Sequence, residues 1–294
     1  MFSGNKKWLY IVLLSIIWGS SFILIKKALT GFTPLQLGSL RIIISGIFLF
    51  IIGFKTLKQL TRNSLKWIVI SGFLGTFFPA FLFAFAETEI DSAIASILNS
   101  LVPLNAMLLG FMIFRISSTR GQIIGVIIGF IGTAFLILNG AAINPDQNYL
   151  YALFVVLATL MYAVNSNIVK RYLQDVPALA IAVGNFAVII IPAFAILIYD
   201  DFFTAEVFES PDFKLSLFYI LLLSIFGTAI AKVFYNKLIQ ISTPVFASSV
   251  TYLMPIVAVL WGVLDGEGFS FWQGAATGII LLGVYLSNAK KRSV

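Results

Sequence analysis

The chain has 294 residues, of which 60% are hydrophobic and 11% are charged, and its mean hydropathy is +1.02. Soluble domains contain about 45 to 50% apolar and about 25% charged residues, so this composition excludes an ordinary soluble protein. The net charge of +7 does not indicate nucleic-acid binding, because the basic residues lie between apolar runs and at the termini rather than along one stripe.

The sequence contains no cysteine and no histidine. It therefore lacks disulfides, thiol nucleophiles, imidazole bases and the commonest transition-metal ligands. We predict that the protein is not an enzyme and that it has no catalytic residues, no metal site and no cofactor. The apolar run from Trp8 to Ile25 is longer than the 7 to 15 residues, roughly, of a cleavable signal core, so we expect an uncleaved first membrane span.

A membrane-spanning helix needs about 20 mostly apolar residues. Runs of this kind follow one another along the whole chain, and they predict an all-α integral membrane protein with ten transmembrane helices. The predicted spans are 8–27, 34–54, 64–85, 92–114, 120–139, 149–169, 178–199, 215–235, 243–264 and 270–288.

The links between these spans are short and carry turn signals, such as Thr33-Pro34 and Thr243-Pro244. If the amino terminus is cytoplasmic, most of the 19 basic residues fall in cytoplasmic links and every acidic residue except Asp175 falls outside. Basic residues collect on the cytoplasmic side of membranes. We therefore predict a multi-pass protein of the bacterial cytoplasmic (inner) membrane, with both termini in the cytoplasm.

Two stretches of the chain align at a constant offset. Residues 75–115 match residues 227–267, so that Gly75-Thr76 meets Gly227-Thr228 and Pro103 meets Pro255. The charges of the equivalent links change sign between the copies, because Arg115 pairs with Glu267. Sign reversal indicates copies of opposite orientation in the membrane. We predict two inverted five-helix repeats, residues 1–142 and 143–294, around a central cavity.

The first and sixth spans carry matched polar and aromatic residues at the depth where a substrate would bind. Trp18 and Ser21 lie three residues apart on one helix face, and Tyr162 with Asn165 repeats this pattern in the second copy. Polar groups at membrane depth are costly and favour the bundle interior. These four residues are candidate substrate-binding residues, and the alternative is helix packing.

Three more candidate substrate-binding residues lie in other spans. Asn99 and Tyr252 precede the equivalent prolines of the fourth and ninth spans, where interhelical hydrogen bonding is the alternative. Arg41 lies inside the second span and could bind an anionic group such as a carboxylate, or play a structural role. Lys232 also lies within an apolar run, and we expect it to snorkel toward the cytoplasmic surface.

Glycines recur at four-residue spacing in the fifth span, at Gly121, Gly125 and Gly129, and in the tenth span, at Gly274 and Gly278. This spacing is typical of a helix-contact face. The contact could be internal packing or a homodimer interface. A phosphate-binding loop is excluded, because no Lys-Ser or Lys-Thr follows the glycines.

With these residues the sequence resembles the drug/metabolite transporter superfamily, specifically its EamA-type members, over nearly its whole length. The resemblance rests on WGSSF at 18–22, TPLQLGSLR at 33–41, the A-S-x-L-x-S-L-x-P pattern at 95–103 and SSVTYLMPIVAVLWGVLDGE at 248–267. One departure is Phe114-Arg115, where the first repeat of the family ends its fourth span with Gly-Glu. The resemblance implies a bundle of inverted repeats that moves small metabolites such as amino acids or purines, mostly outward.

The expected function is thus a secondary transporter whose partners are a small-molecule substrate and the lipid bilayer, with no nucleic acid. No carboxylate or histidine lies well inside a span, so we expect facilitated or weakly coupled transport, with Glu87 as the remaining candidate for ion coupling. Two alternatives share the fold: a sensor or structural subunit without transport activity, and a flippase for a lipid-like substrate.

Overall fold

The structure is a computed structural model that describes residues 2–114, 120–143 and 147–288, and these residues form helices and no strand. The first half contains α1 (Phe2–Ala28), α2 (Pro34–Gly53), η1 (Phe54–Gln59), α3 (Arg62–Gly72), η2 (Phe73–Phe77), α4 (Phe78–Ala86), α5 (Ser92–Asn99), α6 (Val102–Phe114) and α7 (Arg120–Ile143). The second half contains η3 (Tyr149–Tyr151), α8 (Ala152–Tyr172), α9 (Ala178–Tyr199), α10 (Ala205–Glu209), α11 (Phe213–Leu222), η4 (Leu223–Ile230), α12 (Ala231–Ile241), α13 (Pro244–Ser248), η5 (Ser249–Tyr252), α14 (Met254–Leu264) and α15 (Phe271–Asn288).

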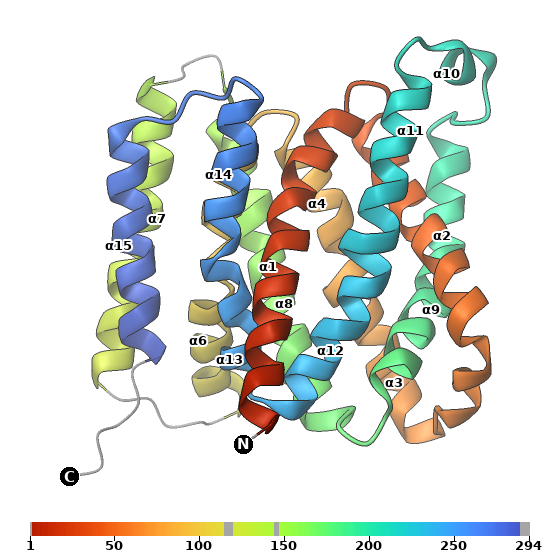
Figure 1. Ribbon diagram of the computed structural model, residues 1–294, viewed down its shortest axis with the longest axis horizontal. Helices are drawn as coiled ribbons and strands as arrows, with labels where there is room; N and C mark the ends of the chain where they lie inside the picture. Colours follow the sequence, from red (N-terminus) through yellow and green to blue (C-terminus); the bar gives the residue numbers. More distant parts are fainter. Residues whose placement is uncertain (1, 115–119, 144–146, 289–294) are drawn as a thin grey trace.

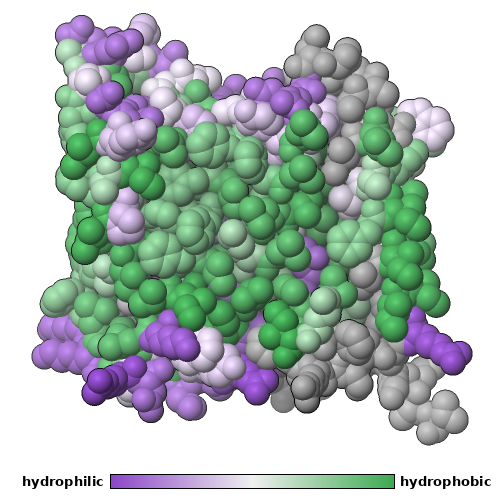
Figure 2. Space-filling model, turned by 180° about the vertical axis from the view of Figure 1, so that it is seen from behind, coloured by the Kyte–Doolittle hydropathy of each residue, from purple (hydrophilic) through white to green (hydrophobic). Residues whose placement is uncertain are grey.

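The helices have the length and composition of membrane spans. In the described part of the chain, 8 helical segments are long and apolar enough to cross a membrane. Two shorter apolar helices, Ile123–Leu136 and Phe271–Gly283, lie with their axes along the bundle. Figure 2 shows an apolar belt between polar rims at the two ends of the molecule. The predicted fold class, an all-α membrane protein, is confirmed.

The equivalent spans of the two halves run in opposite directions. In Figure 1 the third span rises from α3 to α4, whereas its counterpart descends from α11 to α12. An odd number of spans in each repeat requires this inversion, because the second repeat must enter the membrane from the opposite face. We call the end of the bundle that carries the amino terminus the proximal end, and the opposite end the distal end.

The third and eighth spans each contain a π-helical turn, η2 and η4, at the Gly-Thr pair that the two repeats share. A π turn inserts one extra residue into a helix, and such turns often occur at functional sites. The fourth and ninth spans are interrupted just before Pro103 and Pro255. Each proline takes one of the first two positions of the next helix, where its missing N–H is not needed.

Threonines of the predicted turns begin the helices that follow them. The Thr33 hydroxyl accepts a hydrogen bond from the Gln36 N–H at 3.1 Å, and the Thr243 hydroxyl accepts one from the Phe246 N–H at 3.1 Å. Each satisfies an N–H that the first helical turn leaves without a partner. The Thr-Pro turn signals therefore mark the N-termini of the second and ninth spans.

The glycine face of α7 is an internal contact. A Cβ atom on Gly283 of α15 would lie 2.4 Å from the backbone nitrogen of Gly129, so the two helices touch backbone to backbone. The close approach of Gly283 to Gly129 is possible because both residues are small. The Gly274–Gly278 face of α15 does not take part in internal packing, since a Cβ on Gly278 would meet nothing within 4 Å and one on Gly274 only the Phe269 ring at 3.7 Å. The homodimer alternative for this face stays a prediction.

Candidate functional site

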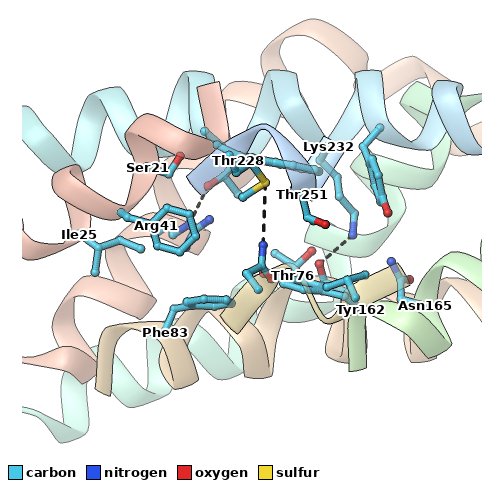
Figure 3. A pocket seen from close by; sticks show the side chains of 18 residues that line it. Ser21, Ile25, Arg41, Thr76, Phe83, Tyr162, Asn165, Thr228, Lys232 and Thr251 are labelled. Carbon is cyan, nitrogen blue, oxygen red and sulfur yellow. Dashed lines mark hydrogen bonds between the residues drawn. The ribbon is translucent and has the colours of Figure 1, made fainter. Parts of the chain in front are cut away.

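A cavity lies between the two repeats, within a ring of helices in which α1 and α8 each contact both α5 and α12. The space between its lining atoms is about 820 Å³, which includes its open mouth. Its polar lining residues are Ser21, Arg41, Thr76, Asn99, Asn165, Thr228, Lys232 and Thr251, and its aromatic ones are Trp18, Phe22, Phe83, Tyr162 and Tyr235 (Figure 3).

Six of the seven predicted substrate-binding residues line this cavity: Trp18, Ser21, Arg41, Asn99, Tyr162 and Asn165. Their roles in binding remain predictions. Tyr252 is not among the lining residues and packs against the buried core instead, while its neighbour Thr251 faces the cavity. Thr251 and Tyr252 lie in the short helix η5, where consecutive side chains point in different directions.

The residues of α1 face the eighth span. The Trp18 indole N–H donates to the Gly227 carbonyl oxygen at 2.8 Å, and the Trp18 ring packs edge-on against Tyr235 with 4.9 Å between ring centroids. The Ser21 hydroxyl donates to the Ile17 carbonyl one turn earlier, at 2.9 Å. Trp18 therefore presents a ring of fixed orientation to the cavity.

The residues of α8 form the opposite wall. Tyr162 lies nearly parallel to Phe83 with 6.1 Å between ring centroids. Asn165 is 2% exposed, and its side-chain oxygen accepts a hydrogen bond from the Ser71 hydroxyl at 2.7 Å. That bond leaves the amide nitrogen of Asn165 beside Gly75, since a Cβ on Gly75 would lie 2.4 Å from it. Asn165 thus packs between helices and also reaches the cavity.

The two π turns receive matched hydrogen bonds across the repeats. Trp18 of the first repeat donates to Gly227 of η4, and the Lys232 ammonium of the second repeat donates to the Gly75 carbonyl of η2 at 3.0 Å. Because a π turn widens the helix, its carbonyl oxygens are available to partners outside the helix. The equivalent glycines therefore link the repeats at the wall of the cavity.

Lys232 corrects the sequence-based interpretation. It was expected to snorkel toward the membrane surface, but it is 6% exposed and lines the cavity. The preceding π turn explains the difference, because one extra residue turns the following helix face by about 100° relative to a regular helix. Arg41 also lines the cavity, and its Nε donates to the Thr228 hydroxyl at 2.7 Å.

Asn99 lines the cavity at the break in the fourth span. The Asn99 amide nitrogen lies 3.9 Å from the Met254 sulfur, a weak acceptor, and the Asn99 side-chain oxygen has no hydrogen-bond partner in the described part of the chain. The Ser100 hydroxyl donates to the Thr251 carbonyl at 2.9 Å and joins the two interrupted spans. The Asn99 oxygen is therefore a buried acceptor without a partner among the described residues.

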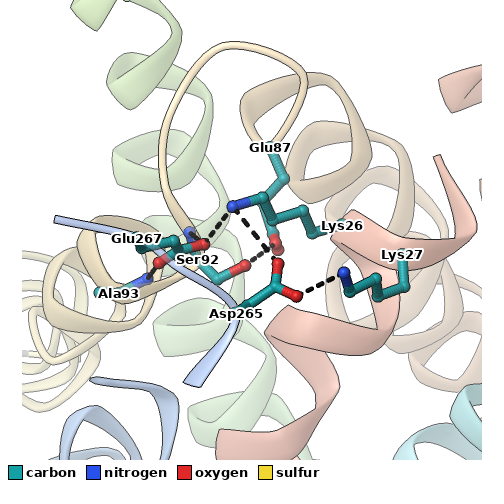
Figure 4. Close-up of polar contacts among 7 residues, drawn as sticks. All are labelled: Lys26, Lys27, Glu87, Ser92, Ala93, Asp265 and Glu267. Atoms are coloured by element: carbon teal, nitrogen blue, oxygen red, sulfur yellow. Dashed lines mark hydrogen bonds and ion pairs between the residues drawn. The ribbon is translucent and has the colours of Figure 1, made fainter. Parts of the chain in front are cut away.

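A network of charged side chains lies at the distal end of α1 (Figure 4). The Lys26 ammonium lies 2.7 Å from Glu267 and 3.8 Å from Asp265, and Lys27 pairs with Asp265. The Glu267 carboxylate also accepts the backbone N–H groups of Ser92 and Ala93, at 3.2 and 3.3 Å, at the start of α5. One carboxylate thus joins α1, α5 and the end of the ninth span. Its counterpart Arg115 lies outside the described residues.

Glu87 adjoins this network and is 6% exposed. One of its carboxylate oxygens accepts a hydrogen bond from the Ser92 hydroxyl at 3.0 Å, and the other has no partner in the described part of the chain. Burial raises the pKa of the Glu87 carboxyl well above its ordinary value of 4.5, and the negative charge of Glu267 adds to this. The Ser92 hydrogen bond and the charges of Lys26 and Arg41 oppose the rise.

Glu87→Gln is expected to raise the unfolding temperature at pH 8. A carboxyl whose pKa is higher in the folded state binds protons preferentially there, so it lowers stability as pH rises from about 4.5 through the raised pKa. Glutamine resembles the protonated acid, and its advantage should shrink as the pH falls toward 5. Thermal unfolding of the purified variants between pH 5 and 8 measures this difference.

Glu89→Gln is the control, because this carboxylate lies in the same link and is partly exposed. It should leave the pH profile unchanged. If Glu87→Gln instead lowers the unfolding temperature more at pH 8 than at pH 5, then the folded protein holds Glu87 ionised against Lys26 and Arg41.

Sequence reasoning missed several lining residues, notably Phe83, Thr228 and Tyr235. The repeat offset carried a signal for one of them, since Gly227-Thr228 matches Gly75-Thr76 at a conspicuous position in each copy. Phe83 and Tyr235 had no such signal, because aromatic residues are common throughout the spans. Only the packing of the helices decides which of them face the cavity.

A bundle of inverted helical repeats around a cavity at mid-depth, with interrupted spans at its wall, is the architecture of a secondary transporter. The chain matches the EamA-like transporter family twice, over residues 5–138 and 149–289. The protein therefore belongs to this family and is a membrane transporter of the drug/metabolite type. The division into repeats at residue 142 stays a prediction.

The similar proteins are also transporters. YedA, an uncharacterised inner membrane transporter of Escherichia coli (strain K12), is 28% identical over 93% of this chain and 87% of its own. An uncharacterised transporter of Archaeoglobus fulgidus is 24% identical over 97% and 100%. A protein of Chlamydia muridarum named as an S-adenosylmethionine/S-adenosylhomocysteine transporter is 24% identical over 94% and 89%.

A solved crystal structure shares the fold. It superimposes with a TM-score of 0.66 at 16% sequence identity, over 97% of this chain and 96% of the other. At this identity the likeness concerns the path of the backbone. It covers both halves of the chain.

Proposed function

We propose that the protein exports a small organic metabolite across the cytoplasmic membrane by alternating access to the central cavity. The observation that carries this proposal is a cavity lined by matched residues from both inverted repeats, Trp18 with Ser21 and Tyr162 with Asn165. A site between inverted repeats can face either side of a membrane when one repeat rocks against the other.

The ion pairs at the distal end support a conformation that is closed on that side. The distal end is closed by the ion pairs of Lys26 and Lys27 with Glu267 and Asp265. Opening that end requires separating α1 from the link between α14 and α15, and rotation of the repeats would do so. The described conformation thus corresponds to one closed toward the distal side.

We propose that the distal side is the outside of the cell. Basic residues such as Lys55, Lys58 and Arg62 gather near the proximal end, in η1 and the start of α3. Acidic residues such as Glu206 and Glu209 gather in α10 at the distal end. Basic links remain cytoplasmic during membrane insertion, so both termini are assigned to the cytoplasm.

A binding screen with the detergent-purified protein tests the function. Amino acids, purines, nucleosides and cationic drugs are compared by thermal shift, because a ligand that binds only the folded protein raises its unfolding temperature. We expect at least one compound to stabilise the wild type but not Trp18→Ala or Asn165→Ala. The protein should exchange that compound in proteoliposomes without an imposed pH gradient.

One result would contradict the proposal, and another would change the expected energy coupling. Exchange that is absent for every stabilising compound would favour a sensor or structural subunit. Exchange that stalls without a pH gradient and disappears in Glu87→Gln would replace facilitated transport with proton-coupled transport. Lys214→Ala, at an exposed lysine of α11 away from the cavity, is the matched control and should behave like the wild type.

A further inference from the structure

Two basic side chains reach the cavity from opposite repeats. Arg41 comes from α2 of the first repeat, and Lys232 comes from α12 of the second. In the view of Figure 3 they lie on either side of Thr251. An arginine stays charged at any physiological pH, so the cavity contains at least one permanent positive charge.

No carboxylate balances these charges within the cavity. The lining residues include no aspartate or glutamate, and the ion pairs found in the described part of the chain all belong to the distal network. Glu87 is the acidic group whose charge reaches Arg41, but it forms no ion pair with it and bonds to Ser92 instead.

The hydrogen bonds of both basic groups are incomplete. Arg41 donates through Nε to Thr228, which leaves its two terminal amino groups without a partner in the described residues. Lys232 donates one of its three N–H groups, to the Gly75 carbonyl. Arg41 is partly exposed and Lys232 is buried, and a buried cation costs several kcal/mol, roughly, unless it is paired and hydrogen-bonded. A bound anion would supply both requirements.

We infer that the cavity binds its substrate through a negatively charged group, a carboxylate or a phosphate, held by Arg41 and Lys232. This inference rests on the transport function proposed above and assigns the substrate class of the same site. A guanidinium with free terminal amino groups can bind such a group through two parallel hydrogen bonds. The ammonium of Lys232 provides the second positive charge.

The remaining lining describes the rest of the substrate. Trp18, Tyr162 and Phe83 offer flat apolar surfaces, which suit an aromatic or other planar body. The Asn99 oxygen and the Thr76 hydroxyl are buried and without partners in the described part of the chain, so a ligand N–H or O–H has acceptors available. The substrate is thus a small organic anion with a planar body and at least one hydrogen-bond donor.

A series of probes with one body and different charges tests the inference. We would measure the affinity of the purified protein for 3-phenylpropanoate, 3-phenylpropyl phosphate, 3-phenylpropanamide and 3-phenylpropylamine. The wild type is expected to bind at least one of the two anions about tenfold or more tighter than the amide, and the amine weakest. Comparison of the carboxylate with the phosphate identifies the anionic group.

The variants separate charge recognition from packing. Arg41→Gln and Lys232→Gln should each weaken the binding of the preferred anion about tenfold while leaving the affinity for the amide unchanged. Arg41→Lys should recover part of the preference, because it restores the charge without the planar donors. Lys214→Gln removes an exposed positive charge from α11 and should change neither affinity.

The inference is overturned if the wild type binds the amide or the amine as tightly as both anions. It is also overturned if neither anion binds, or if the glutamine variants keep the full preference. When neutral or cationic solutes of the wider screen are still exchanged in proteoliposomes, the transport function stands and only the substrate class is wrong. When no solute is exchanged, the transport function fails as well.

Discussion

Gly75→Ala is expected to reduce substrate binding and transport about tenfold or more. The new Cβ would lie 2.4 Å from the Asn165 amide nitrogen and 2.7 Å from the Lys232 ammonium, both too close for ordinary contact. One methyl group would therefore displace two cavity side chains at once. Ligand affinity and exchange in proteoliposomes measure the effect.

The loss of stability should be much smaller than the loss of function. The displaced atoms are the far ends of side chains, which can move, and alanine favours a helix over glycine by about 1 kcal/mol. The unfolding temperature should fall by a few degrees at most. A large fall, with the affinity of the remaining folded protein unchanged, would show that Gly75 serves packing alone.

Two other glycines provide matched controls. Gly278→Ala adds the same methyl group to an exposed position of α15, where a Cβ would meet nothing within 4 Å, and it should leave binding unchanged. Gly227→Ala places its Cβ 2.7 Å from the Ser21 hydroxyl oxygen, and that small group can rotate away. We expect its effect on binding to lie between those of the other two variants.

Lys26→Ala is expected to open the distal end of the cavity. Glu267 would lose its cation while its side chain, 2% exposed, kept only two backbone N–H partners. Breaking a buried pair costs about 3 to 5 kcal/mol, and an exposed pair contributes about 1 or less. Since Lys26 is one-third exposed, we expect the closed form to lose about 2 kcal/mol, roughly a thirtyfold change in population.

The absence of native cysteine makes this change measurable. A single Ser21→Cys substitution puts a unique thiol in the cavity wall. We expect a membrane-impermeant maleimide, added to intact cells, to label this thiol about tenfold or more faster in the Lys26→Ala background. Labelling from outside also tests the orientation proposed for the distal end.

Lys27→Ala is the control for the Lys26 variant. Lys27 is more exposed and pairs with Asp265 alone, so its removal should change the labelling rate by less than about threefold. If labelling increases only in inverted vesicles, the distal end faces the cytoplasm and the orientation is wrong. If neither background changes the rate, the ion pairs do not control access.

Much of the architecture could be predicted from the sequence because it depends on local properties. The length of each apolar run determines whether a helix can span the membrane, and Thr33-Pro34 and Thr243-Pro244 begin helices through their own side chains. The duplication is visible as an offset in the printed sequence. Because lipid offers no hydrogen-bond partners, the backbone N–H and C=O groups of each apolar run must bond to one another, which requires a helix.

Part of the cavity was also predictable, because polar residues at membrane depth must avoid lipid. Trp18, Ser21, Tyr162 and Asn165 could be chosen on that ground together with their repetition in both copies. The same reasoning cannot distinguish a polar residue that lines the cavity from one that packs between helices. Asn165, which hydrogen-bonds Ser71 and also lines the cavity, does both.

The tertiary structure alone decided where Lys232, Thr251 and Glu267 lie. The π turn of η4 rotates Lys232 into the cavity, and the break in the ninth span selects Thr251 rather than Tyr252. Glu267 joins α1 to α5 at the distal end because α5 presents its first N–H groups to it. The direction of a side chain depends on how far the helix has rotated about its axis up to that residue and on which helices lie beside it. The apolar residues of a span specify neither.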